Sequence, residues 1–83
     1  MKIEIIPSAE NDIKDIYFHI LNKFKVPLTA DRFLDGINQT IQTLKSEPNR
    51  GATYNVKYRK IFYKRWRIVY EVKGDTVYII AVE

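Results

Sequence analysis

Residues 66–82, WRIVYEVKGDTVYIIAV, decide the fold. They are rich in Val, Ile, Tyr and Trp, whose branched or aromatic side chains favour an extended backbone. Lys73-Gly74-Asp75 interrupts this run with residues that are typical of a tight β-hairpin turn. We therefore predict two antiparallel strands, at Arg67–Val72 and Thr76–Val82.

The same residue types continue upstream and predict a third strand near Val56–Tyr63, joined to the next strand by a turn at Lys64-Arg65. Alternate residues of a strand share a face. The last strand is apolar on both faces, with Val77, Ile79 and Ala81 on one and Tyr78, Ile80 and Val82 on the other. Helices can cover only one face, so we expect the second face to be weakly buried or completed by another chain.

Two amphipathic helices are predicted before the sheet. The apolar stripe of the first consists of Ile13, Ile16, Tyr17, Ile20, Leu21 and Phe24. The stripe of the second consists of Ala30, Phe33, Leu34, Ile37, Ile41 and Leu44. Ser8 and Thr29 are the expected N-terminal caps. Gly36 inside the second helix is attributed to close approach of the two helices.

A short strand at Lys2–Ile6 is predicted to end at Pro7, which cannot continue a hydrogen-bonded ladder. The predicted fold class is therefore α+β, with an N-terminal strand, an antiparallel helical hairpin and then a three-stranded antiparallel sheet. We expect residues 1–83 to form a single domain.

The composition restricts the chemistry. The chain has no Cys and one His, His19, so thiolate zinc sites and thiol nucleophiles are excluded, and neither a metal site nor a cofactor is predicted. No apolar run approaches the roughly 20 residues that cross a bilayer, and the N-terminus lacks the pattern of a signal peptide. We expect a cytoplasmic protein with no membrane partner.

The net charge of +4 is distributed unevenly. Residues 1–41 contain five Lys or Arg and six Asp or Glu, whereas residues 42–83 contain nine and four. The acids Glu10, Asp12 and Asp15 are expected to form a solvated face at the start of the first helix. The basic half should attract polyanions or acidic partners.

Basic and aromatic residues alternate in one block of the basic half. The block contains Lys57, Tyr58, Arg59, Lys60, Phe62, Tyr63, Lys64, Arg65, Trp66 and Arg67. Cations neutralise phosphate and aromatic rings stack on unpaired bases, so the block suits contact with an anionic macromolecule. Alternatively, Lys64 and Arg65 form a solvated turn, and Tyr58, Phe62 and Tyr63 pack within the sheet.

Arg67 lies inside a predicted strand, where a permanently charged guanidinium needs a carboxylate, a phosphate or ordered water as its partner. Glu71, four residues along, is too far for direct contact on an extended strand. Glu4 is the alternative structural partner.

The chain resembles the RelE/ParE superfamily of bacterial toxins from type II toxin–antitoxin systems over nearly its whole length. The motifs that carry the resemblance are PSAENDIKDIY (7–17), ADRF (30–33), Pro48 with Gly51, YRK (58–60), WRIVYEV (66–72) and GDTVYIIAV (74–82). The resemblance implies a strand–helix–helix–three-strand fold. It also implies a cognate antitoxin protein that neutralises the toxin by covering exposed sheet and groove.

Two branches of the superfamily imply two activities. ParE-like members poison DNA gyrase, and the helix pair and the Ala9–Tyr17 pattern favour this branch, so we expect a growth-inhibiting toxin of a plasmid-stabilisation module. RelE-like members are mRNA interferases, metal-independent endoribonucleases that act on mRNA at the ribosome. On that reading Arg67 and Arg59 match catalytic positions. RelE-like nucleases continue beyond the position of Glu83 into a tail needed for cleavage, so catalysis is not expected if Glu83 is the natural C-terminus.

On either reading, contacts with the target or the antitoxin are expected from the residues Lys57, Arg59, Lys60, Trp66 and Arg67. A third hypothesis is a protein-interaction module without toxicity.

Overall fold

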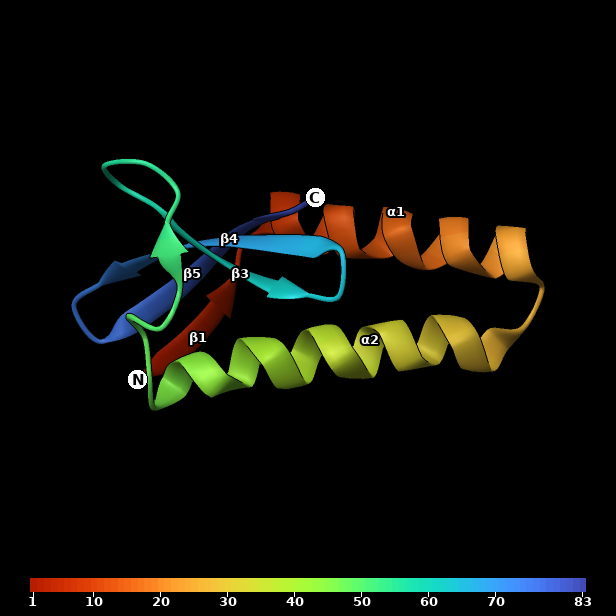
Figure 1. Ribbon diagram of the computed structural model, residues 1–83, viewed down its shortest axis with the longest axis horizontal. Helices are drawn as coiled ribbons and strands as arrows, with labels where there is room; N and C mark the ends of the chain where they lie inside the picture. Colours follow the sequence, from red (N-terminus) through yellow and green to blue (C-terminus); the bar gives the residue numbers. More distant parts are fainter.

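The computed structural model describes residues 1–83 and contains two long helices and one sheet (Figure 1). The elements in order are β1 (Lys2–Ile5), α1 (Pro7–Phe24), α2 (Pro27–Gln42), the 3-10 helix η1 (Thr43–Lys45), β2 (Ala52–Thr53), β3 (Arg59–Tyr63), β4 (Trp66–Lys73) and β5 (Thr76–Val82). The α+β class and the helical hairpin predicted from the sequence are confirmed.

The sheet has five strands in the order β1-β5-β4-β3-β2. The three predicted antiparallel strands are its centre, and β5 has the predicted bounds Thr76–Val82. The N-terminal strand β1 joins them by pairing parallel with β5, Ile3 opposite Val77 and Ile5 opposite Ile79. The two-residue strand β2 was not predicted, because Ala52 and Thr53 are too few to show an alternating pattern.

The segment before β3 differs from the prediction. The strand begins at Arg59 and not near Val56, because Asn55 closes a tight loop instead. The Asn55 side-chain oxygen accepts hydrogen bonds from the backbone N–H groups of Lys57 and Tyr58, both at 2.8 Å. Asn competes with strand pairing in this way through its short polar side chain.

Both helices begin at a proline. Pro7 and Pro27 occupy first-turn positions, where the missing N–H is not needed and the fixed φ suits the helix. Ser8 and Thr29 therefore lie inside the helices, and the prediction that they are caps was wrong. The Ser8 hydroxyl instead donates to the carbonyl oxygen of Ile80 at 3.0 Å, which ties α1 to the last strand.

One hydrophobic core lies between the helical hairpin and one face of the sheet. Its buried members are Ala9, Ile20, Ala30, Phe33, Ile37, Ile41, Leu44, Ile61, Ile68, Tyr70, Val77, Ile79 and Val82. Most predicted stripe residues face this core, but Leu34 and Phe24 remain exposed. Phe24 is exposed because the hairpin extends past the sheet, as Figure 1 shows, so its outer part has no strand to pack against, whereas Leu34 is exposed in a cavity that it shares with Ile5 and Ile13.

A β-bulge changes the expected faces of β5. Val69 pairs with Ala81 and Tyr70 with Ile79, so Ile80 has no partner and the alternation shifts after it. Val82 consequently enters the core, and Ala81 lies on the other face, the reverse of the prediction. The freed N–H of Val82 donates to the Asp12 carboxylate at 3.0 Å. Asp12 is thus a docking contact of α1 and not part of a solvated acidic face.

Gly36 permits a close approach, but the partner is not the other helix. A Cβ atom at this position would overlap the ring of Tyr63 from β3. The glycine therefore allows the end of the β3–β4 hairpin to pack against α2.

We use the name open face for the side of the sheet away from the helices, which carries Lys60, Phe62, Arg67, Val69, Glu71 and Tyr78. This face was expected to be weakly buried or completed by another chain, and it carries charged as well as apolar residues. Val69 and Glu71 are buried, and Lys57 of the β2–β3 loop reaches Glu71 with a distance of 3.8 Å from Nζ to Oε2. Neither helix has the length and apolar character needed to span a membrane.

Candidate functional site

Arg67 and Lys60 lie together on the open face, and both are close to the ring of Tyr54. The Arg67 guanidinium carbon is 5.2 Å from the ring centroid of Tyr54, and the Lys60 Nζ is 6.0 Å from it. Phe62, the partner of Arg67 across β3 and β4, is 55% exposed. This part of the open face therefore combines two cations with two accessible aromatic rings.

The partner of Arg67 is Glu83. Arg67 Nε and Nη2 lie 2.8 and 2.7 Å from Glu83 Oε1, and the Tyr54 hydroxyl donates to the same oxygen at 3.3 Å. Arg67 therefore has a carboxylate as its partner, one of the three kinds of partner expected from the sequence. The prediction of Glu4 as the structural partner is wrong. Glu4 lies on β1 opposite Tyr78, and β5 separates β1 from β4.

Arg59 lies on the opposite face of the sheet from Arg67. It pairs with the core residue Tyr70, and its Nη1 donates to the carbonyl oxygen of Gly51 at 2.9 Å and to that of Asn49 at 3.4 Å. These bonds hold the connection between the helices and the sheet. The structure does not bring Arg59 and Arg67 together around one point.

Lys57 is held above the open face by Glu71. The nearly buried Glu71 carboxylate is shared, with Lys57 and Lys73 each 3.8 Å away from one of its oxygens. Lys57, Lys60 and Arg67 thus belong to the same face, whereas Arg59 and Trp66 do not.

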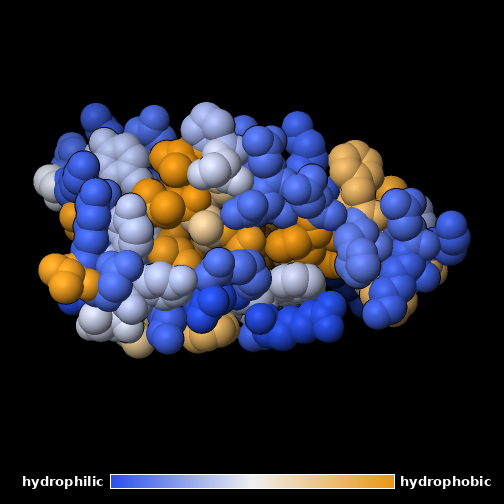
Figure 2. Space-filling view, turned by 90° about the horizontal axis from the view of Figure 1, so that it is seen from above, coloured by the Kyte–Doolittle hydropathy of each residue, from blue (hydrophilic) through white to orange (hydrophobic).

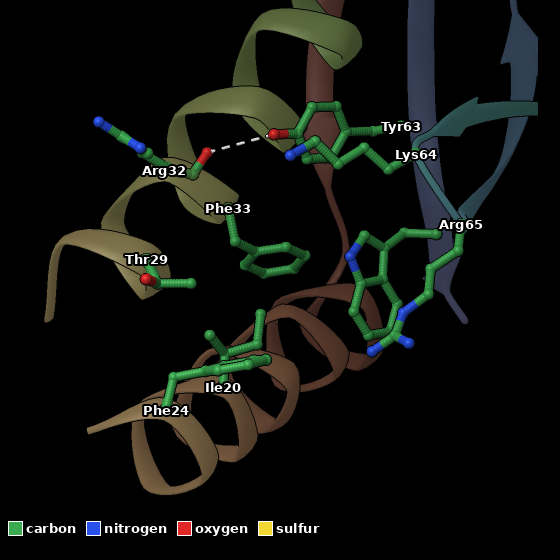
Figure 3. Close-up of a pocket in the computed structure, with 9 residues that line it drawn as sticks. Ile20, Phe24, Thr29, Arg32, Phe33, Tyr63, Lys64 and Arg65 are labelled. Carbon is green, nitrogen blue, oxygen red and sulfur yellow. Dashed lines mark hydrogen bonds between the residues drawn. The ribbon is translucent and has the colours of Figure 1, made fainter. Parts of the chain in front are cut away.

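Trp66 lines a cavity between the outer part of the hairpin and the β3–β4 turn (Figure 3). We call it the tryptophan pocket; its volume is about 430 Å³ and its lining residues are Ile20, Phe24, Thr29, Arg32, Phe33, Tyr63, Lys64, Arg65 and Trp66. Phe33 and Trp66 meet edge to face at its base, with ring centroids 5.5 Å apart. No lining residue is acidic.

Lys64 and Arg65 form the predicted turn, but they also border this pocket. The Lys64 Nζ is 5.6 Å from the ring centroid of Tyr63, and the Arg65 guanidinium carbon is 4.6 Å from that of Trp66. Phe24, Arg32 and the other helical members of the pocket were not predicted as site residues from the sequence. They are 30 or more positions from Trp66, and no local pattern joins them to it.

A second concave surface runs along the helical hairpin. Two adjoining cavities share Ile13 and Leu34, and their other apolar members are Ile5, Tyr17, Phe18, Ile37 and Ile41. In Figure 2 hydrophobic residues appear as a broken band along the long axis, bordered by hydrophilic residues. No cluster of His, Cys, Asp and Glu suitable for a metal ion is present.

Together, the fold and these surfaces define a small α+β protein that presents a basic open face, an aromatic pocket and an apolar helical groove. The same architecture occurs in a solved structure titled "Chromosomal ParDE TA system from P. aeruginosa", with a TM-score of 0.87 and 22% sequence identity. The alignment covers 100% of this chain and 94% of the other.

The family model for the ParE toxin of the type II toxin–antitoxin system parDE matches residues 3–83. The chain belongs to this ParE toxin family, and its resemblance to the RelE/ParE superfamily is thereby confirmed. The search of the curated proteins finds no match.

Proposed function

We propose that the protein is a cytoplasmic toxin, folded as one domain over residues 1–83, which inhibits DNA gyrase and is neutralised by a cognate antitoxin. The observation that supports this proposal most directly is the match of the ParE family model to residues 3–83. The structural likeness to a chain of a ParDE system, at 22% identity, supports the fold on which the proposal depends.

The placement of the arginines favours gyrase inhibition over RNA cleavage. A minimal ribonuclease needs cations that converge on the scissile phosphate. Arg59 and Arg67 lie on opposite faces of the sheet, so they do not converge on one phosphate. We assign Lys57, Lys60 and Arg67 to contact with the target through the open face, Trp66 to contact with the antitoxin, and Arg59 to support of the sheet.

Growth and gyrase assays test the proposal. Expression without an antitoxin should stop bacterial growth, and the purified protein should make gyrase accumulate cleaved DNA. Cut mRNA on ribosomes with unaffected gyrase would instead support the RelE-like alternative. Normal growth during expression of the folded protein would support the non-toxic interaction module.

Charge substitutions on the open face would locate the target site. Lys60→Glu with Arg67→Gln should weaken gyrase inhibition, because the open face then presents less positive charge to its target. The control is Lys14→Glu with Lys45→Gln, which makes the same change in net charge at two exposed residues on the helical side of the molecule. Equal losses in both variants would contradict a role for the open face.

A further inference from the structure

The tryptophan pocket has a preformed apolar base. Phe33 is 4% exposed and Ile20 is 6% exposed, and the edge-to-face contact of Phe33 with Trp66 fixes both rings. Phe24, in contrast, forms a wall that is 51% exposed to water. A large aliphatic or aromatic side chain that entered the pocket would remove this apolar surface from water.

The border of the pocket carries uncompensated positive charge. Lys64 and Arg65 form no ion pair, whereas Lys57, Arg67 and Lys73 each lie within 4.0 Å of a carboxylate. Figure 3 shows the Lys64 and Arg65 side chains on the strand side of the cavity and the Arg32 side chain turned outward from α2. A ligand with carboxylates outside the pocket would therefore meet cations and no opposing acid.

The backbone of Lys64 has a conformation that glycine would adopt more easily. Its φ is 53°, in the left-handed region, where a residue other than glycine is destabilised by about 1–2 kcal/mol. Glycine would remove this cost but would also remove the ammonium group. Strained residues of this kind are concentrated at functional sites.

We propose that the tryptophan pocket binds an acidic segment of the antitoxin, which packs one large apolar side chain against Phe33, Trp66 and Phe24 and directs carboxylates to Lys64 and Arg65. The inference rests on the proposed function, which supplies the antitoxin as partner. A protein segment is favoured over a nucleic-acid strand because the pocket is a concave, partly open cavity with a recessed apolar base, and not a flat stacking surface beside a phosphate track.

Trp66 is the only tryptophan of the chain, so its indole N–H signal in an NMR spectrum reports on the pocket directly. The probe is a blocked peptide of sequence Asp-Glu-Leu-Phe-Asp-Glu, titrated to millimolar concentration. We expect a saturable shift of the Trp66 signal. A peptide with Lys in place of the acids, a peptide with Ala in place of Leu-Phe, and single-stranded oligothymidylate should leave it unchanged.

Paired charge reversals test whether the acidic peptide is attracted to Lys64 and Arg65 in particular or to positive charge anywhere on the protein. Lys64→Glu with Arg65→Glu should weaken binding of the acidic peptide by about tenfold, in line with two partly exposed ion pairs. Lys57→Glu with Lys60→Glu makes the same change in net charge on the open face and should leave the affinity near that of the wild type. Lys64→Gln with Arg65→Gln removes both charges without reversing them, and it should weaken peptide binding by a smaller factor. This variant keeps the test decisive if the double reversal disturbs folding.

Several results would overturn the inference. These are the absence of a Trp66 shift with the acidic peptide, an equal shift with the oligonucleotide, or an equal loss in the open-face variant. With the antitoxin that neutralises the wild-type protein, an unchanged affinity for the Lys64→Glu, Arg65→Glu variant would also overturn it. Because the peptide titration uses the isolated toxin, it can fail while gyrase inhibition is retained, which distinguishes this failure from failure of the proposed function.

Discussion

Tyr70 shows how one side chain joins the two halves of the chain. It is fully buried, its hydroxyl donates to the Pro48 carbonyl oxygen at 2.8 Å, and the hydroxyl accepts from the Gly51 N–H at 3.0 Å. A Cβ on Gly51 would come within 2.7 Å of the Lys60 carbonyl oxygen, so the residue facing the hydroxyl must be glycine. The connection from helices to sheet is thus fixed by a residue in the middle of β4.

We predict that Tyr70→Phe lowers the free energy of unfolding by about 1–3 kcal/mol, because the buried N–H of Gly51 loses its partner. Urea denaturation measures the change. Tyr78→Phe is the matched control, since the Tyr78 hydroxyl forms no hydrogen bond within the protein, and it should change stability by less than about 0.5 kcal/mol. Equal effects of the two substitutions would contradict the role given to Tyr70.

The Arg67–Glu83 pair has short distances but limited burial. The two side chains are 38% and 44% exposed, so water screens their attraction. A double-mutant cycle with Arg67→Gln and Glu83→Gln should give a coupling free energy below about 1 kcal/mol in denaturation experiments. A pair this weak can exchange Glu83 for an anion of a partner. A larger coupling free energy would indicate that the main role of Arg67 is to stabilise the fold.

At the scale of elements, the β3–β4 turn contains a charged residue, Lys64, in a backbone conformation that favours glycine. Lys64→Gly should raise the free energy of unfolding by about 1 kcal/mol, because glycine adopts the left-handed conformation without a steric cost. Arg65→Gly is the control, since Arg65 does not have a positive φ, and it should not stabilise the protein. Chemical denaturation compares the two variants. A lower free energy of unfolding for Lys64→Gly would contradict the claim that the backbone of Lys64 is strained.

The sequence predicts the elements better than it predicts their contacts. Hydrophobic periodicity and the Lys73-Gly74-Asp75 turn identify both helices and the three central strands. The bulge at Ile80 escapes detection because an apolar residue there fits either face. The helix starts are wrong because Ser8 is a good cap in isolation, whereas Pro7 already fixes the first turn and Ser8 has a tertiary partner in Ile80.

The residues of the candidate site were likewise easier to identify from the sequence than the contacts between them. Trp66 and Arg67 stand out in the sequence because aromatic and charged residues alternate there. Their separation into a pocket and an open face depends on the strand register, which opposes Tyr63 to Trp66 and Phe62 to Arg67. The contribution of Phe24 depends on how far the helices extend past the sheet, and no local sequence pattern encodes this distance.

At the scale of the whole molecule, the shape is elongated, with principal extents of 41 × 21 × 21 Å, because the hairpin continues beyond the sheet. Apolar side chains therefore remain accessible on the helices. Phe18 is 51% and Leu34 is 38% exposed along the helical groove. A toxin without its partner should expose this surface to water.

We predict that the isolated protein binds the dye ANS and that Phe18→Ser with Leu34→Ser reduces the dye fluorescence severalfold without loss of the far-UV circular dichroism signal. The reason is that both residues contribute exposed apolar area to the groove. Phe62→Ser, on the open face, is the control and should change the fluorescence less. An equal or larger decrease for Phe62→Ser would place the main exposed apolar surface on the sheet.

The parallel pairing of β1 with β5 joins the first strand to the last. During synthesis on the ribosome, Lys2–Ile5 leaves the exit tunnel before the other strands but has no partner strand until Thr76–Val82 has been made. The helical hairpin can form earlier, since its contacts are local. The sheet can close only after β5 has been synthesised, so a chain that ends before Thr76 lacks the complete folded toxin.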